Sequence, residues 1–188
     1  MYKDTTRVLV FDLELTCEEP TPPGYESEII QVGVAYLELP SLEITGRAEF
    51  LVKPPTQPIS EYCTELTGIT ARDIKKYGVD FRVALKWMTE KYGFRRYVSM
   101  AWGDDRLDIV RQCRKFGFPE LYDESHGEFI NLAALAALKG LAKRGGLLGA
   151  MKALGLEFEG RQHTAGDDAY NTARVLRELL PPLKVATT

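Results

Sequence analysis

Three segments in the first third of the chain have the residue pattern of buried β-strands. Residues 6–15, 28–39 and 43–54 are rich in apolar and β-branched side chains, and each ends close to proline, glycine or other turn-forming residues. Short runs bounded in this way favour strands over helices. A loop with prolines and a glycine follows the first segment, and a short turn separates the second from the third. We therefore predict an antiparallel meander of three strands.

The spacing of apolar residues becomes helical in the rest of the chain. In residues 79–93, Phe81, Leu85 and Met88 recur at helical spacing, and Gly93 provides a C-terminal stop. Similar patterns predict helices at about 60–67, within 104–118, and at about 131–142, 146–154 and 166–180, and strands at 96–102 and near 128–131. Three strands followed by alternating helices and strands predict an α/β fold, with helices covering the faces of a mixed sheet.

Length and composition are those of an ordinary globular protein. The 188 residues are 45% hydrophobic and 27% charged, which suits a single domain over residues 1–188 with a core at about 7–180. The formal net charge of -3 gives no support by itself to a nucleic-acid partner, because most duplex-binding proteins are basic. It does not exclude one either, because bound metal ions can reverse the sign of the charge at a local site.

The cysteines and the N-terminus bear on the cellular compartment. Cys17, Cys63 and Cys113 are far apart and form no C-x-x-C pair, so we expect reduced thiols rather than a disulfide framework or a zinc cluster. The N-terminus leads directly into the first strand without a signal peptide, and no apolar run approaches the ~18 residues that a membrane span needs. We expect a cytoplasmic protein without a membrane segment; the sequence does not indicate protein partners.

Two carboxylates interrupt the first predicted strand. In the stretch RVLVFDLELTC, Asp12 and Glu14 stand in an otherwise apolar run, with Leu13 between them. Residues two apart in a strand point to the same face, so the two acids project together and Leu13 points the other way. Burying two like charges costs several kcal/mol per unpaired ion. A positive group should therefore lie between them, or they should lie at an exposed end of the strand.

Two further acidic pairs stand where secondary-structure elements meet. Asp104 and Asp105 lie where the fourth strand passes into a helix, and Asp167 and Asp168 begin the last helix. Carboxylates at such positions can simply cap a helix and interact with its dipole. His163 precedes Asp168 by five residues.

Taken together, these acids have a more specific explanation than capping. Hard cations such as Mg²⁺ and Mn²⁺ prefer oxygen ligands, and pairs of them ~3.5–4 Å apart clamp the oxygens of a phosphate displacement. Such a site needs several carboxylates from different elements, and a nearby histidine can accept the proton of the attacking water. The combination predicts a metal-dependent site for phosphate ester hydrolysis.

The same stretches resemble a known family. FDLELT, WGDDRLDIVRQC and HTAGDDAYNTA resemble the first, second and third motifs of the DEDDh 3′-to-5′ exonucleases, including the His-x-x-x-x-Asp spacing. The longer stretches FDLELTCEE, EIIQVGVAYLEL, YCTELTGIT and GRQHTAGDDAYNTARV resemble the branch of ERI-1 and the histone-mRNA 3′ exonucleases. The resemblance extends from about residue 7 to residue 178.

This resemblance implies a fold, a cofactor and a reaction. The fold would be RNase H-like, with a five-stranded mixed sheet flanked by helices. Two divalent metal ions, Mg²⁺ or Mn²⁺, would be held by Asp12, Glu14, Asp105 and Asp168, with His163 as general base. The partner would be the 3′ end of single-stranded RNA or DNA, with RNA favoured. Hydrolysis of the terminal phosphodiester by metal-activated water would release a 5′-mononucleotide.

The second motif leaves a choice between two adjacent acids. In the family an apolar residue commonly follows the metal-binding Asp by four positions. Asp105 is followed in this way by Ile109, whereas Asp104 is followed by Asp108. We favour Asp105, which places Asp104 where the family commonly has an aromatic residue.

Alternative interpretations remain for one residue and for the whole chain. Thr16 lies two positions after Glu14 and could bind the terminal nucleotide or simply suit a strand. A binding module that has kept the fold and lost turnover is disfavoured, because all five catalytic residue types are present. A mononuclear iron oxygenase is a distant option, since the chain has only two histidines and neither forms a His-x-Asp pair.

Overall fold

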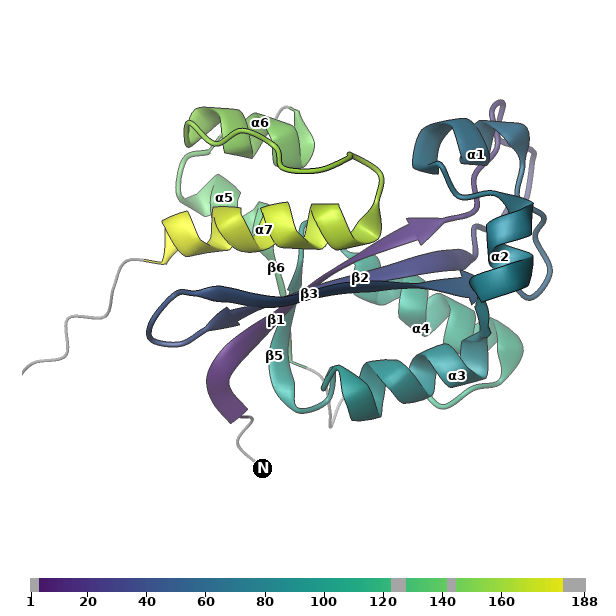
Figure 1. Ribbon diagram of the computed structural model, residues 1–188, viewed down its shortest axis with the longest axis horizontal. Helices are drawn as coiled ribbons and strands as arrows, with labels where there is room; N and C mark the ends of the chain where they lie inside the picture. The colour runs from purple at the N-terminus through teal and green to yellow at the C-terminus, as the bar shows by residue number, and fades with distance from the viewer. Residues whose placement is uncertain (1–3, 123–127, 142–144, 181–188) are drawn as a thin grey trace, which may run out of the picture.

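A six-stranded sheet runs through the centre of the computed structural model, which describes residues 4–122, 128–141 and 145–180 (Figure 1). The strands lie in the order β4–β3–β2–β1–β5–β6. Their bounds are Asp4–Leu15 for β1, Ile29–Glu38 for β2, Ile44–Lys53 for β3, Val79–Asp80 for β4, Tyr97–Ala101 for β5 and Phe129–Asn131 for β6. The first three strands pair antiparallel, whereas β5 runs parallel to β1 and β6 parallel to β5. The predicted meander and mixed sheet are confirmed.

The sixth strand is the one difference from the predicted sheet of five. β4 contains two residues and pairs in parallel with Val52 and Lys53 at the end of β3. A strand of two residues is too short to show a period of two in the sequence. Its position only extends the edge of the sheet at β3.

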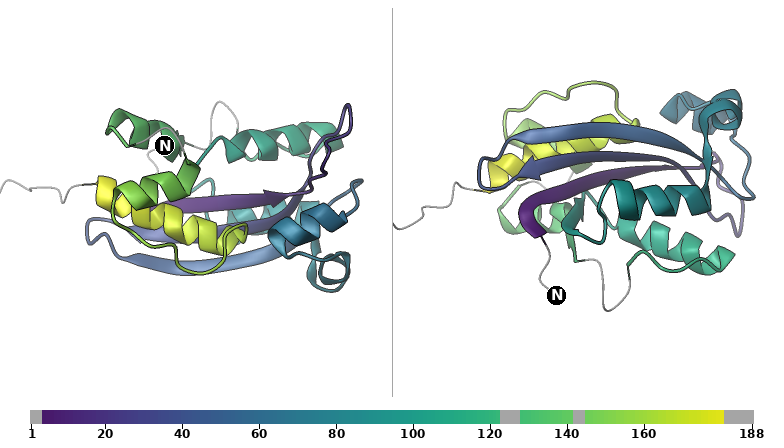
Figure 2. Two further views of the ribbon diagram at one scale, coloured as in Figure 1. Left: turned by 90° about the horizontal axis from the view of Figure 1, so that it is seen from above. Right: turned by 60° about the horizontal axis from the view of Figure 1, so that its bottom comes forward.

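Helices cover both faces of the sheet. Their bounds are Glu61–Thr67 for α1, Ala71–Tyr77 for α2, Phe81–Lys86 for α3, Trp87–Lys91 for the π-helical turn η1, Asp105–Phe116 for α4, Leu132–Leu138 for α5, Gly146–Ala153 for α6 and Ala165–Leu179 for α7. α5, α6 and α7 lie on one face, and α3 and α4 on the other (Figure 2). Among these described helices, none has the length and apolar character needed to cross a bilayer.

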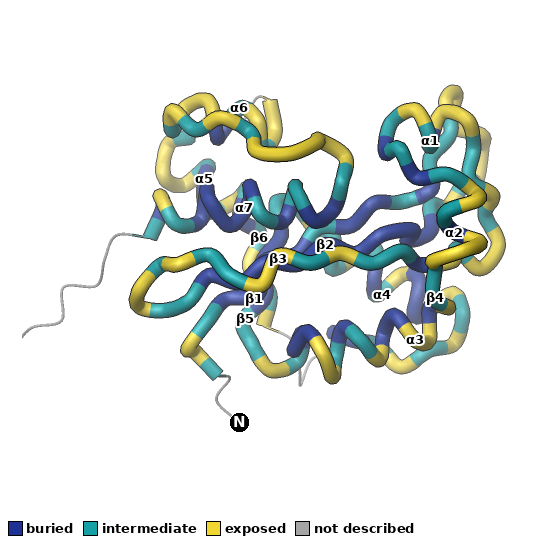
Figure 3. The backbone as a smooth tube through the Cα atoms, in the orientation of Figure 1, coloured by how far each residue is buried: buried dark blue, intermediate teal, exposed yellow. Residues whose placement is uncertain are grey.

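The alternation of side chains along β1 divides the core into two parts. Leu9 and Phe11 pack with residues of α3 and α4, whereas Val8 and Val10 pack with residues of α5, α6 and α7. β2 is accordingly buried over nearly all of its length, and the buried residues of β1 lie in its last two thirds (Figure 3). A strand covered on both faces explains the nearly continuous apolar run of the sequence.

Local signals account for the helices that follow β3. α1 begins as predicted, because the Ser60 hydroxyl accepts a hydrogen bond from the Cys63 amide at 2.9 Å, and it ends at Gly68, whose φ of 76° is left-handed. α2 was not predicted. The side chains of Thr70 and Asp73 form a capping box at its start, a local signal that the apolar pattern of this short segment does not reveal.

Candidate active site

Asp12 and Glu14 project from the face of β1 that α7 covers. They continue the alternation of Val8 and Val10, and Leu13 between them packs in the opposite core. The neighbours in β2 are Gly33 beside Asp12 and Gln31 beside Glu14. Cross-strand neighbours point to the same face of a sheet, so these four positions form one surface beneath α7.

This surface fixes the position at which α7 begins. A Cβ atom at Gly33 would overlap the carbonyl group of Ala165 and the amide nitrogen of Gly166, so the glycine permits direct contact between helix and strand. The Gln31 Oε1 accepts a hydrogen bond from the Ala165 amide at 2.9 Å, and the Glu49 Oε2 accepts one from the Gly166 amide at 3.2 Å. Side chains of the sheet thus satisfy amides that have no partner within the helix.

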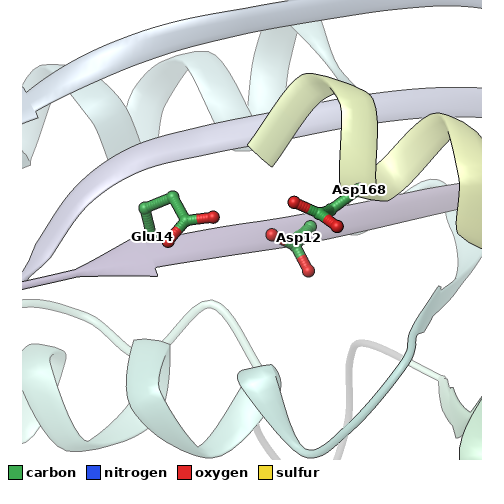
Figure 4. A group of neighbouring side chains, drawn as sticks. All are labelled: Asp12, Glu14 and Asp168. Carbon is green, nitrogen blue, oxygen red and sulfur yellow. The ribbon is translucent and has the colours of Figure 1, made fainter. Parts of the chain in front are cut away.

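This position of α7 places Asp168 next to Asp12 and Glu14. One carboxylate oxygen from each of Asp12, Glu14 and Asp168 lies within 4.8 Å of the other two (Figure 4). Asp168 is oriented by its Oδ2 atom, which accepts a hydrogen bond from the Thr164 amide at 3.1 Å. Acids 154 positions apart in the sequence, at Glu14 and Asp168, therefore share one small volume.

Asp167, the neighbour of Asp168, serves a different purpose. Its Oδ2 accepts a hydrogen bond from the Arg161 amide at 2.6 Å, and its Oδ1 forms an ion pair with Arg47. Asp167 therefore stabilises the loop before α7 and ties it to β3.

The second motif approaches the three carboxylates from α4. Asp105 is the first residue of that helix and is half-buried, and its negative charge contributes to raising the pKa of both Asp12 and Glu14. Asp105 does not belong to the group of three oxygens within 4.8 Å. Asp104 is exposed, forms no side-chain capping hydrogen bond, and is not among the groups that shift the pKa of Asp12 or Glu14.

Burial makes all of these carboxyls weak acids, and repulsion from neighbouring carboxylates adds to its effect at Asp12, Glu14 and Asp105. Burial is the largest cause that raises the pKa of Asp12 well above its ordinary value, followed by the charges of Asp105, Glu14 and Asp168. Burial, with repulsion from Asp168 and Asp105, raises the pKa of Glu14 to about 8, and burial raises the pKa of Asp105 to about 7. The pKa of Asp168 is also raised by burial. All four groups are negative when ionised, so none of them neutralises another.

The donor set fits hard divalent cations. Within the described ranges, no ion pair joins Asp12, Glu14, Asp105 or Asp168 to a lysine or arginine. All four offer carboxylate oxygens, the ligands that Mg²⁺ and Mn²⁺ prefer, and they offer no sulfur ligand. Cations bound here would remove the repulsion that raises the pKa values of the carboxyls.

His163 stands at the exposed edge of this acidic cluster. It directly precedes Thr164, the N-cap residue of α7, and its charge acts to lower the pKa of Asp168. Its φ of 59° is left-handed, which is uncommon for a residue other than glycine. The imidazole is exposed, so it can exchange a proton with solvent.

The side chain of Thr16 is buried inside the loop that follows β1 and does not face the surface. Its side chain is fully buried, and its Oγ1 accepts a hydrogen bond from the Glu28 amide at 2.9 Å. The sequence left open whether Thr16 binds the terminal nucleotide or has only a structural role. The contacts support the structural role.

The residues of the sheet that contact the start of α7 were not identified from the sequence. Gln31 and Gly33 interrupt the apolar run of the second strand at positions two apart, the same spacing as Asp12 and Glu14. That signal is present in the sequence, but its meaning depends on the pairing register, which the sequence pattern does not give. Glu49 carries no distinguishing signal in its own strand.

Comparison with known proteins agrees with this geometry. The sequence model of a family described as exonuclease (RNase_T) matches residues 9–176. The chain is 27% identical to 3′-5′ exoribonuclease 1 of Homo sapiens, over 92% of this chain and 52% of that protein. It is 30% identical to ERI1 exoribonuclease 2 of Mus musculus, over 88% of this chain and 27% of that protein. The chain thus spans about half, or less, of the length of these relatives.

A solved structure shares the fold over almost the whole of both chains. The nuclease domain of 3′hExo, described as a DEDDh family member and crystallised with rAMP, superposes with a TM-score of 0.77 at 26% identity. The superposition covers 93% of this chain and 92% of that chain. Both the family match and the arrangement of the acidic cluster lead to one conclusion: the chain belongs to the RNase T/DEDDh exonuclease family.

Proposed function

We propose that this chain is a metal-dependent 3′-to-5′ exonuclease that releases 5′-mononucleotides from single-stranded nucleic acid ends, with RNA favoured over DNA. The observation that carries the proposal is the convergence of Asp12, Glu14 and Asp168 from β1 and α7. Burial raises the pKa values of all three, and the charges of neighbouring carboxylates raise those of Asp12 and Glu14 further, as expected for a site that awaits cations. The polarity and the preference for RNA are supported by the names of the relatives, which are 3′-5′ exoribonucleases.

Four carboxylates would hold the cofactor. Asp12, Glu14, Asp105 and Asp168 are the ligands that we assign to two divalent ions, Mg²⁺ or Mn²⁺. Such ions supply charge stabilisation at the phosphate and a more acidic water for the attack. The protein's part is to hold the carboxylates in fixed positions: β1 is covered on both faces, and α7 is anchored through Gln31 and Gly33.

We assign the general base to His163. Proton transfer requires a group within reach of the reacting water whose ordinary pKa lies near neutrality, and histidine meets this requirement. The residue lies at the start of α7, next to the cluster but exposed, so a proton taken from the attacking water can pass on to solvent. Its left-handed backbone is a departure from regular geometry of the kind that concentrates at functional sites.

The decisive experiment uses end-labelled oligonucleotides. Single-stranded RNA and DNA of the same sequence are labelled at the 5′ or the 3′ end and incubated with Mg²⁺, with Mn²⁺ or with EDTA. We expect a ladder of shortening products from the 5′-labelled strands and immediate release of labelled mononucleotide from the 3′-labelled strands, with RNA degraded faster. No products should form in EDTA.

A matched variant separates this activity from a contaminant. Asp12→Asn keeps the size and shape of the side chain and removes its charge, so it should fold normally and release no mononucleotide. Degradation that survives in Asp12→Asn purified in the same way would contradict the assignment. Shortening from the 5′ end would contradict the polarity.

A further inference from the structure

We propose that Arg161 binds a phosphate of the substrate strand beside the acidic cluster and so holds the strand at the site. The inference rests on the proposed function and adds to it a binding residue outside the metal and acid–base groups. It starts from the location of the Arg161 side chain.

Arg161 reaches across the end of β1 toward α1. It lies in the loop before α7, and its guanidinium rests against Gly68, the C-cap residue of α1. A Cβ atom at Gly68 would overlap the Nη1 atom and would lie 2.7 Å from the Cζ atom of Arg161. The loop before α7 and helix α1 flank the carboxyl end of β1 (Figure 1). Asp12 and Glu14 of the acidic cluster lie among the last four residues of that strand. The absence of a side chain at position 68 therefore leaves room for the guanidinium in this position.

The Arg161 guanidinium has no hydrogen-bond or ion-pair partner within residues 4–122, 128–141 and 145–180. The neighbouring Arg47 is paired with Asp167, whereas no hydrogen bond or ion pair to the Arg161 side chain occurs among the residues that the structure describes. The backbone amide of Arg161 is anchored to Asp167 at 2.6 Å, so the base of the side chain is fixed while its end is free. Its positive charge nevertheless reaches Glu14, whose pKa it acts to lower. Five unused N–H donors thus lie next to the cluster.

Other anion-binding groups nearby are already occupied. The N-terminus of α7 would be an obvious place for a phosphate. Its first amides, however, donate to Gln31 from Ala165 and to Glu49 from Gly166. The Arg161 side chain, in contrast, keeps its donors available as far as the described residues show.

Space for a ligand exists at this position. An open hollow of about 520 Å³ is lined by Arg161, Arg47, Glu49 and Thr164 together with the start of α7. A guanidinium presents its donors in a fork that matches two oxygens of a phosphate. The formal net charge of -3 does not by itself attract a polyanion, so a positively charged contact beside the site would favour binding of the strand.

The test compares Arg161→Ala and Arg161→Lys with the wild-type chain. We expect Arg161→Ala to raise KM for a single-stranded oligonucleotide roughly tenfold, as for one lost charge-assisted hydrogen bond, with a much smaller change in kcat. The slope of log(kcat/KM) against log[salt] should become shallower by about 0.7, the value for one phosphate contact on a single strand. Arg161→Lys should retain the salt slope, because it keeps the charge, while its KM lies between the other two.

A matched control and a binding measurement complete the test. Arg177→Ala removes the same charge from the opposite end of α7, where the arginine pairs only with Glu178 among described residues, and it should leave KM and the salt slope unchanged. Fluorescence anisotropy with a labelled strand, in the inactive Asp12→Asn background, should show the same loss of affinity on adding Arg161→Ala.

The outcomes separate this inference from the proposed function. If the wild-type chain releases no mononucleotide from any single strand, the proposed function fails, and the inference fails with it. If the wild-type chain is active and Arg161→Ala keeps its KM and its salt slope, only the inference is overturned. A variant that loses kcat alone, or needs more Mn²⁺ at an unchanged KM, would also overturn it, since Arg161 would then act on the carboxylates.

Discussion

The backbone of Ala165 lies directly on Gly33, the cross-strand neighbour of Asp12. No other residue type at position 33 leaves room for this contact, because even a methyl group would overlap the Ala165 carbonyl. The contact sets the height of α7 above the sheet, and so the distance from Asp168 to the carboxylates of β1. A structural glycine in β2 thereby controls the geometry of a site to which it contributes no functional group.

The first prediction concerns this contact. Gly33→Ala should lower the free energy of unfolding by about 1–3 kcal/mol, as for other overpacked positions, and should lower exonuclease activity further than its stability loss explains. Chemical denaturation and the end-labelled assay measure the two effects. Gly103→Ala is the control, because a Cβ there would meet nothing within 4 Å. Normal stability and activity in Gly33→Ala would show that α7 can shift without consequence.

The second prediction concerns Asp12 in the absence of metal. In EDTA, Asp12→Asn should melt at a higher temperature than the wild-type chain, because it removes a carboxyl whose ionised form is disfavoured by burial and by the charges of Asp105, Glu14 and Asp168. With Mg²⁺ or Mn²⁺ added, the order should reverse, because a ligand that binds only the folded state stabilises it and the variant has lost a binding group. Thermal unfolding with and without the cation measures both. An equal cation-induced shift in the two proteins would exclude Asp12 from the metal site.

The third prediction is a dependence of stability on pH in the metal-free protein. The pKa of Glu14 is raised from 4.5 to about 8, and that of Asp105 from 3.8 to about 7, by burial first and then by neighbouring charges. The folded state therefore holds protons that the unfolded chain has released. This contribution is complete below the ordinary pKa values and is lost as pH rises through about 7 to 8.

Melting temperatures in EDTA should therefore fall from pH 5 to pH 9, and the fall should be smaller in Glu14→Gln. Glu28 acts in the opposite direction, because hydrogen bonds from Thr56 and Gln57 help to lower its pKa and its contribution is lost in acid. Saturating Mn²⁺ should remove most of the fall at high pH, because the cation replaces the protons. Stability in EDTA that rises between pH 6 and pH 9 would contradict the raised pKa values.

The fourth prediction distinguishes the two acids of the second motif. Asp105→Asn should reduce kcat strongly and weaken the thermal stabilisation by Mn²⁺, because its charge acts on Asp12 and Glu14. Asp104→Asn should change both quantities little, because Asp104 is exposed. The two substitutions are adjacent and chemically identical, so each controls for the other. The reverse result would assign the metal ligand to Asp104.

β1 and α7 differ in how much of their role at the site can be predicted from the sequence. The apolar run of residues 6–15 is long and nearly unbroken, so it predicts a buried strand whose bounds differ from those of β1 only at the first residues. The spacing of Asp12 and Glu14 places them on one face for the same reason. These features are local, and a period of two is enough to derive them.

The approach of Asp168 to these acids is not local. It depends on a register that sets Gly33 beside Asp12 and Gln31 beside Glu14, and on hydrogen bonds to amides of α7. Periodicity contains no such pairing information, so the convergence could be expected only from the resemblance to a family. Arg161 likewise has no sequence signal of its own, because its proximity to Gly68 appears only once α1 and α7 are placed.

The last prediction uses the unusual backbone of His163. With φ at 59°, the residue occupies a left-handed conformation that costs side chains other than glycine about 1 kcal/mol. His163→Gly should therefore be at least as stable as the wild-type chain, whereas His163→Ala retains the strain. Both should lose activity by about 10²- to 10⁴-fold, the usual contribution of a general base. Turnover at pH values where hydroxide is abundant should recover part of this loss in both variants, since hydroxide needs no base. Activity in His163→Gly close to the wild-type level would show that the left-handed turn, rather than the imidazole, is what the site requires from this position.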